Sequence, residues 1–169
     1  EGASVSIILD LSKQDTSLVW NTPSSIVYGT GLSATQLSAY ESSSVPGTIS
    51  YSCAGVPVTI GSVLTAGNKT LLATFTPTNA NGANPSTKSV VLNVTKATPT
   101  LTWLTPAAIV YGTALSSSQL NASCAASGSY SYSPISGTIL SAGTTQLTVT
   151  FVPADSANLA TSTMTVNIV

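Results

Sequence analysis

The sequence predicts an all-β protein of two similar sandwich domains in series, and two observations carry this prediction. The segment Ile-Val-Tyr-Gly-Thr occurs at residues 26–30 and again at residues 109–113, and Trp20 and Trp103 are separated by the same 83 residues. A repeat of this length with strand-like content is typical of tandem β-modules. In addition, short alternating stretches between turn residues recur along the chain, whereas no stretch keeps the helical period of about 3.6 residues for more than a turn.

The composition limits the classes of partner. Charged residues make up 5% of the chain and hydrophobic residues 43%, which excludes a solvated disordered linker because disorder needs low hydrophobicity and high charge. The net charge of −1 is spread thinly and provides no basic patch, so we expect neither nucleic acid nor an anionic membrane surface as a partner. No apolar run reaches the roughly 20 residues of a membrane helix, so no membrane insertion is expected. A surface of hydroxyl groups near net neutrality instead favours association.

The first element is a lone strand within residues 1–12. Apolar and polar residues alternate there, with Ile8 as the single exception, which is typical of a half-buried strand. Residues 6–13 also match residues 89–96 at the offset of 83. We therefore expect the chain to begin with the last strand of a preceding repeat. The apolar face of this strand comprises Val5, Ile7, Leu9 and Leu11.

The first full repeat is expected to span residues 13–95. Its clearest strand has Leu71, Ala73 and Phe75 on one face, and Pro77 ends it because proline cannot donate to a ladder. Pro23 marks a kink between the first strand and its continuation. The predicted strands cover residues 16–20, 25–28, 36–40, 48–53, 70–75 and 88–95, with a short crossing segment at 58–64.

The second repeat is expected to span residues 96–169. Leu147, Val149 and Phe151 repeat the alternation of the clearest strand, and residues 163–169 form the closing strand. Short strands separated by turn signals favour a sandwich, so we predict two tandem immunoglobulin-like β-sandwich domains. Only residues 95–99 separate the two repeats, and a link this short and stiffened by proline predicts a rod.

The second repeat also resembles a known family over its whole length. The resemblance rests on Trp, Thr-Pro, Ile-Val-Tyr-Gly-Thr, Leu-Ser, Gln-Leu-Asn-Ala, Tyr-Ser-Pro, Gly-Thr-Ile-Leu-Ser-Ala-Gly and Leu-Thr-Val-Thr-Phe-Val-Pro-Ala-Asp, followed by a Val-rich strand. This succession is similar to the bacterial Ig-like repeats of the MBG type in large secreted and cell-surface proteins. The resemblance implies an extracellular stalk, adhesive or filament-forming role without catalysis, and it identifies no ligand.

The first repeat departs from this pattern at three places. Cys53 stands where the second repeat has Pro134, the segment that ends at Leu64 is longer, and Asn79 stands where the second repeat has Asp155. These departures predict locally specialised loops on an unchanged fold.

The residue inventory argues against catalysis. The chain has no His, so Ser-His-Asp and Cys-His nucleophiles are excluded, and its five acidic residues offer no pair that the sequence places together. Without His, and with two distant Cys, the chain has no evident metal-ligand set. Asp155 is better explained as a loop cap than as a calcium ligand. We expect no enzymatic activity, no cofactor and no metal.

The two cysteines occupy non-equivalent positions, since Cys53 aligns with Pro134 and Cys124 with Glu41. Neither domain can therefore hold its own disulfide. Following the strands from pole to pole places both cysteines at the junction of the domains, so an interdomain Cys53–Cys124 disulfide is a specific hypothesis. Two separate thiols, or bonds between molecules, are the alternatives.

These observations favour a non-enzymatic structural module of a bacterial extracellular assembly, a filament subunit or a surface stalk. It would assemble as a homo-polymer, or with neighbouring Ig-like repeats, through β-strand addition of residues 4–12 to a neighbour. The alternative is an adhesin that binds carbohydrate or a host protein through loops at one pole of a domain, such as residues 40–47 and 78–86. Those loops contain no aromatic platform and little charge, and Trp20 and Trp103 occupy core-type positions, which favours the structural interpretation.

Overall fold

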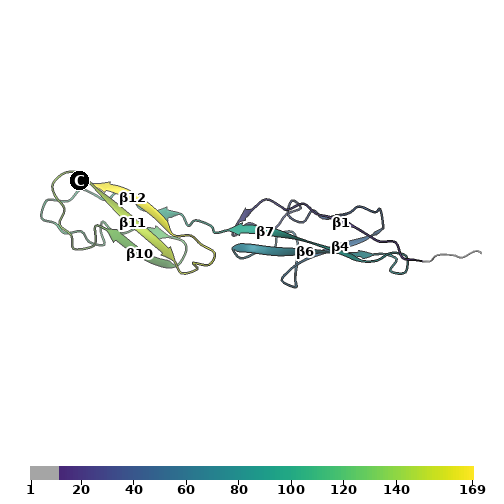
Figure 1. Ribbon diagram of the computed structural model, residues 1–169. Coiled ribbons are helices and arrows are strands. Elements are labelled where there is room, and N and C mark those ends of the chain that lie inside the picture. Colours follow the sequence, from purple (N-terminus) through teal and green to yellow (C-terminus); the bar gives the residue numbers. More distant parts are fainter. Residues whose placement is uncertain (1–11) are drawn as a thin grey trace, which may run out of the picture. The chain divides into compact units, whose positions relative to one another are not determined.

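The computed structural model of the 169-residue chain describes residues 12–169. The predicted strand with Val5, Ile7, Leu9 and Leu11 lies outside the described residues. Within them all regular secondary structure is β, which confirms the predicted fold class. The chain divides into two compact units (Figure 1), which we call unit 1, formed largely by the chain up to Asn93, and unit 2, formed largely by Val94–Val169.

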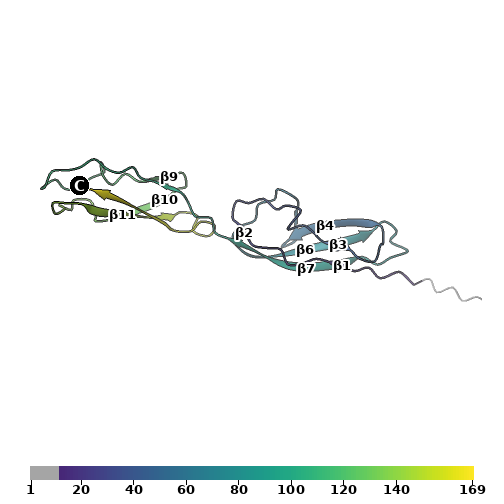
Figure 2. The ribbon, with the colours of Figure 1, turned by 90° about the horizontal axis from the view of Figure 1, so that it is seen from above.

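Unit 1 is a sandwich of two layers. One layer has five strands in the order β2-β7-β6-β4-β5, and the other consists of β1 paired with β3. Figure 2 shows β7, β6 and β4 along the length of this unit. The strands are β1 (Leu18–Val19), β2 (Ile26–Val27), β3 (Tyr40–Glu41), β4 (Gly47–Cys53), β5 (Val56–Val58), β6 (Gly67–Pro77) and β7 (Ser86–Thr95).

Unit 2 repeats this plan with fewer strands. Its larger layer has the order β10-β11-β12, and these strands lie side by side in Figure 1, while β8 pairs with β9 in the second layer. The strands are β8 (Leu101–Thr102), β9 (Ser123–Cys124), β10 (Gly128–Ser133), β11 (Thr145–Pro153) and β12 (Ser162–Ile168).

The central strand of each larger layer supplies the centre of the core. On β6 the side chains of Leu71, Ala73 and Phe75 are buried, while the residues between them are more exposed. On β11 the same holds for the three predicted residues, Leu147, Val149 and Phe151. The alternation in the sequence therefore correctly predicted which face of each strand meets the second layer.

Equivalent residues keep the same pairing register in both units. Leu18 pairs with Glu41 in unit 1, as Leu101 pairs with Cys124 in unit 2. Tyr51 pairs with Ala73 on the neighbouring strand, as Tyr132 pairs with Val149. These registers place Cys124 at the position of Glu41, and Cys53 at the position of Pro134, as the sequence alignment predicted.

The predicted strand at residues 36–40 is wrong. Residues 34–36 form a turn, because the backbone N–H groups of Gln36 and Leu37 both donate to the Ser33 carbonyl. The Gln36 amide oxygen also accepts from the Ser33 N–H and hydroxyl groups, so a side chain holds this segment out of the sheet. Only Tyr40–Glu41 pairs as a strand.

The predicted crossing segment at residues 58–64 is also incorrect at its start. Val56–Val58 turns back beside β4 as the strand β5, and its register pairs Cys53 with Val56. The two residues of the turn, Ala54 and Gly55, both have positive φ angles, 50° and 79°. Two central residues of this kind match the twist of a two-residue hairpin.

Each unit holds the linker that leads into it in the same way. In unit 1 Gln14 forms a parallel bridge with Ala83, and in unit 2 Ala97 forms one with Leu159. Each linker residue makes two backbone hydrogen bonds of 2.8 to 3.0 Å, one donated and one accepted, to the loop before the last strand. We call this contact, Gln14 with Ala83 in unit 1 and Ala97 with Leu159 in unit 2, the linker seat. It is part of the repeated structure.

Candidate interaction surfaces

Each unit is organised around a Trp–Gln–Tyr cluster. In unit 1 the Trp20 indole N–H donates to the Gln36 carbonyl at 3.1 Å, and the Trp20 ring meets Tyr51 edge-on at a centroid distance of 5.3 Å. In unit 2 Trp103 donates to Gln119 at 2.9 Å and meets Tyr132 at 5.4 Å. Both indoles are buried, as predicted, and so they provide no exposed platform for a sugar ring.

The phenol groups of this cluster face the interior. Burial raises the pKa of Tyr51, partly offset by its hydrogen bond to the Ala39 carbonyl. Burial likewise raises the pKa of Tyr132, whose oxygen accepts from the Ala122 N–H at 3.0 Å. Both hydroxyls therefore stay protonated at neutral pH and act structurally.

The glutamine of this cluster was not identified from the sequence. The spacing Ser33-x-x-Gln36 recurs as Ser116-x-x-Gln119, and in both units the Gln side chain accepts from the Ser N–H at 3.1 Å. A Ser followed three residues later by Gln is a known turn-closing pattern. Its repetition at the offset of 83 was the signal that could have located the turn.

The outer edge of the larger layer differs between the units. In unit 1 the strand β5 covers the end of β4, and Pro57 stands at the centre of β5. Proline has no N–H group, so it removes a donor from an exposed edge and opposes further pairing. In unit 2 the strand β10 corresponds to β4, and no further strand of the described chain covers it, so β10 is itself the edge strand of the larger layer.

A groove follows this edge in each unit. In unit 1 it has a volume of about 570 Å³ and lies between the β4–β5 hairpin and the segment around Leu37. In unit 2 the volume is about 390 Å³, between β10 and the segment around Leu120. An exposed isoleucine borders each groove, Ile60 at 69% and Ile135 at 70% exposure.

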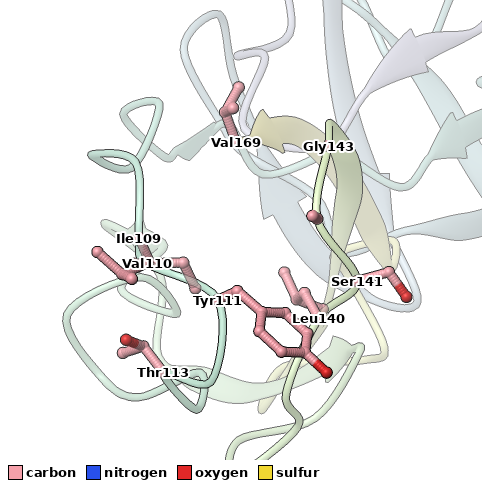
Figure 3. Close-up of a pocket in the computed structure, with 9 residues that line it drawn as sticks. Ile109, Val110, Tyr111, Thr113, Leu140, Ser141, Gly143 and Val169 are labelled. Carbon is pink, nitrogen blue, oxygen red and sulfur yellow. The ribbon is translucent and has the colours of Figure 1, made fainter.

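The repeated Ile-Val-Tyr-Gly-Thr motif lines a smaller hollow in unit 2. Figure 3 shows Tyr111 and Leu140 bordering this hollow, of about 140 Å³, from two different segments, with Val169 beside it. Val110 and Tyr111 are 80% and 76% exposed. The motif is therefore a surface feature here, held to the last strand by the bond from the Ile109 N–H to the Val169 carbonyl.

The loops at the linker end of unit 1 surround another hollow, of about 350 Å³. Residues of the predicted adhesin loops line it, among them Val45, Pro46, Thr78 and Asn79. The lining has no aromatic ring to stack on a sugar and no charged group to pair with a charged peptide.

Two acidic side chains act as loop caps. The Asp155 carboxylate accepts from the Asn158 N–H at 3.2 Å, as the sequence interpretation expected. The Glu41 carboxylate accepts from the N–H groups of Ser43, Val45 and Ser17. Desolvation acts to raise the pKa of Glu41, but these hydrogen bonds outweigh it and hold the pKa below its ordinary value of 4.5.

The cysteines lie at the positions that the sequence assigned within each repeat. Cys53 is the last residue of β4, and Cys124 is the last residue of β9, opposite Leu101. Both are half-buried and are present as free thiols. The interdomain disulfide stays a prediction.

Two features that often mark a ligand site are absent from the described part of the chain. Among residues 12–169 no three His, Cys, Asp or Glu side chains gather where they could hold a metal ion. In the same range every buried side-chain nitrogen or oxygen atom has a hydrogen-bond partner within the protein. No helix of the described chain is long and apolar enough to cross a membrane.

Comparison with known proteins gives a structural similarity without a sequence family. No protein-family model and no curated protein matches the chain. Among solved structures the chain is similar to Drosophila N-cadherin EC1–4, with a TM-score of 0.36 and 11% sequence identity over 92% of this chain. The chain spans 49% of the length of that structure.

Proposed function

We propose that this chain is a non-enzymatic structural module of a bacterial extracellular assembly, a filament subunit or a surface stalk. The linker seat is the observation that carries this proposal. Gln14 and Ala97 occupy equivalent places in the two units, each bonded to the loop before the last strand. Because the residues before Ala97 form the last strand of a repeat, and residues 6–13 match them in sequence, the segment before Gln14 is suited to end another repeat.

The proposed mode of assembly is strand addition. Residues 4–12 present Val5, Ile7, Leu9 and Leu11 on one face in the sequence pattern. Burying four such side chains contributes about 1.5–3 kcal/mol each, so pairing with a sheet is strongly preferred over exposure to water. Added to the sheet of a neighbouring copy, this strand would link modules into a polymer.

The size of the native particle tests this proposal. Light scattering with negative-stain imaging should show polymers for the full chain and monomers for a chain that lacks residues 1–12. Particles of the same size for both proteins would contradict strand addition, and monomers in both cases would leave the array of covalently joined repeats as the mode of action.

A disulfide between Cys53 and Cys124 is a further part of the proposed mechanism, because it would fix the angle between the two modules. Peptide mapping under non-reducing conditions, on protein secreted into an oxidising compartment, should recover the two cysteine-containing peptides as one linked species within a monomer. Recovery of both as free thiols, or as a species found only in dimers, would contradict it.

The second candidate is an adhesin module, which would bind in the hollow between the loops of unit 1, where residues of both predicted adhesin loops meet. A bulky side chain at its rim should then block binding. Thr78→Trp would abolish retention on a glycan or protein array, while the equivalent Ala154→Trp in unit 2 would leave it unchanged. No retention of the unmodified chain, or equal loss in both variants, would exclude this use of the hollow.

A further inference from the structure

We infer that the outer edge of β10 in unit 2 is the acceptor for the apolar N-terminal strand, residues 5–11, of a second copy of this chain. The inference rests on the proposed strand addition and names the place where that strand pairs. It comes from a comparison of the same sheet edge in the two units, together with the direction of the backbone groups on β10.

Backbone groups of β10 point outward at every second residue. The Ala154 N–H donates to the Ser127 carbonyl, and the register continues through Ser129↔Val152 and Ser131↔Thr150. In an antiparallel ladder the bonded pairs alternate, so Ser129 and Ser131 turn their N–H and C=O groups toward β11. The groups of Tyr130 and Tyr132 then face away from the sheet.

In unit 1 the outward-facing backbone groups at the equivalent position are paired with the strand β5. The equivalent of Tyr132 is Tyr51, whose position pairs with Val58 of β5. Among residues 12–169 no backbone partner is found on the outward side of Tyr130 and Tyr132. Unpaired donors and acceptors on an edge strand are a template for another strand.

In unit 1 the strand β5 covers the edge of β4 over Tyr51–Cys53, whereas no strand of the described chain covers β10 in unit 2. In β5 the residues Val56 and Val58 pair back to β4, so the position that would donate outward is Pro57, which has no N–H group. On β10 the outward positions are tyrosines, which keep their donors. Because the edge strand of unit 1 has a proline at its outward position and that of unit 2 has tyrosines, we expect an incoming strand to pair with unit 2.

The groove beside β10 suits the apolar face of that strand. Leu120, Tyr130 and Ile135 line it, and 70% of the Ile135 surface is exposed. The occupant is the N-terminal segment because apolar residues take every second position from Val5 to Leu11, a stretch of seven residues close to the six-residue length of β10. The groove lining has no charged residue, and the one charged residue of residues 5–11, Asp10, falls on the polar face of the sequence pattern.

A matched pair of variants tests the acceptor. Ile135→Glu places a charge at the groove of unit 2, and Ile60→Glu does the same in unit 1. Both side chains are about 70% exposed, so both proteins should fold. Ile135→Glu should raise the concentration needed for polymer formation by about tenfold or more, the factor that corresponds to about 1.4 kcal/mol. Ile60→Glu should change it by less than about twofold.

Amide exchange provides a readout at the atoms themselves. A synthetic peptide of residues 3–12, added to the chain that lacks residues 1–12, should slow exchange of the Tyr130 and Tyr132 N–H groups. The N–H groups of Ser129 and Ser131 already bond to β11 and should change little, as should that of Tyr51 in unit 1.

The outcomes separate this inference from the proposed function. If removal of residues 1–12 disperses the polymer but Ile135→Glu does not, strand addition stands and β10 is not the acceptor. A larger effect of Ile60→Glu than of Ile135→Glu would overturn the assignment in favour of unit 1. Polymers that persist without residues 1–12 would overturn both, and would point to pairing of two β10 edges.

Discussion

Units 1 and 2 share their interior and differ at their margin. The buried Trp, the Ser-x-x-Gln turn and the Tyr that meets the indole edge-on recur with nearly the same distances. In contrast, the covering strand β5 and its Pro57 exist only in unit 1. The shared part supports the fold, because each Trp bonds to the Gln of the turn and also packs against the Tyr of the larger layer. The variable part determines which strand lies at the outer edge of the larger layer, β5 in unit 1 and β10 in unit 2.

Removal of the central aromatic ring should have the largest effect and should be equal in the two units. Phe75 and Phe151 are buried to 2% and 0% exposure on equivalent strands. Phe75→Ala and Phe151→Ala should each destabilise their own unit by about 3–5 kcal/mol, because the transfer and cavity terms add.

Urea unfolding checks this, followed by the fluorescence of Trp20 or Trp103 with the other replaced by Phe. A difference of more than about 2 kcal/mol between the two variants would break the equivalence of the cores.

Loss of the turn-closing glutamine should have an intermediate effect that differs between the units. Gln36 is 7% exposed, whereas Gln119 is half-buried. Gln36→Ala should cost about 1–2 kcal/mol, because the Ser33 N–H loses its acceptor in a more buried site. Gln119→Ala should cost less, since water reaches the Ser116 N–H more easily. Thermal unfolding of both variants, with Gln→Glu at each site as a size control, measures the difference, and a larger loss for Gln119→Ala would refute the argument from burial.

A substitution in the β4–β5 turn should act on unit 1 alone. Gly55 has a φ angle of 79°, and a Cβ there would meet no atom within 4 Å, so the penalty for Gly55→Ala is backbone strain only. We expect a loss of about 1 kcal/mol in the stability of unit 1 and no change in unit 2. Ala54→Gly is the control. It should be nearly neutral, because the strain relieved at the positive φ angle of Ala54 is offset by the larger conformational entropy that Gly loses on folding. Unfolding curves resolved by unit would show the contrast, and a change in unit 2 would contradict it.

The smallest effect should be a pH response confined to unit 1. Hydrogen bonds lower the pKa of Glu41 below 4.5 in the folded state. A lowered folded pKa means that the stabilising contribution is present above the unfolded value and is lost as the pH falls through the folded pKa. Amide exchange of Ser43 and Val45 should therefore accelerate below about pH 4.5, in excess of the intrinsic pH dependence, relative to Glu41→Gln. Unit 2 has Cys124 at this position, so its equivalent turn should show no such change.

The sequence was sufficient for the fold class, for the buried faces of β6 and β11 and for the non-equivalent positions of the two cysteines in their repeats. These depend on period and repetition, which are visible in one chain. It was insufficient for residues 36–40, where a strand was predicted but the Gln36 side chain closes a turn. It also missed β5, because a three-residue strand around a proline has no period of its own, and only the Ala54–Gly55 turn determines its pairing.

The linker seat has a mechanical consequence. Gln14 bonds to the loop at Ala83, only three residues before β7 begins, and β7 then runs without interruption to the next linker at Thr95. Tension applied along an array would thus pass from one linker through two backbone hydrogen bonds into a single strand and out again. While those two bonds hold, the load bypasses most of each sandwich, and once they break, the first strand can peel away. In such an array the two backbone hydrogen bonds of Gln14 would therefore set the first mechanical limit of each module, ahead of the buried core.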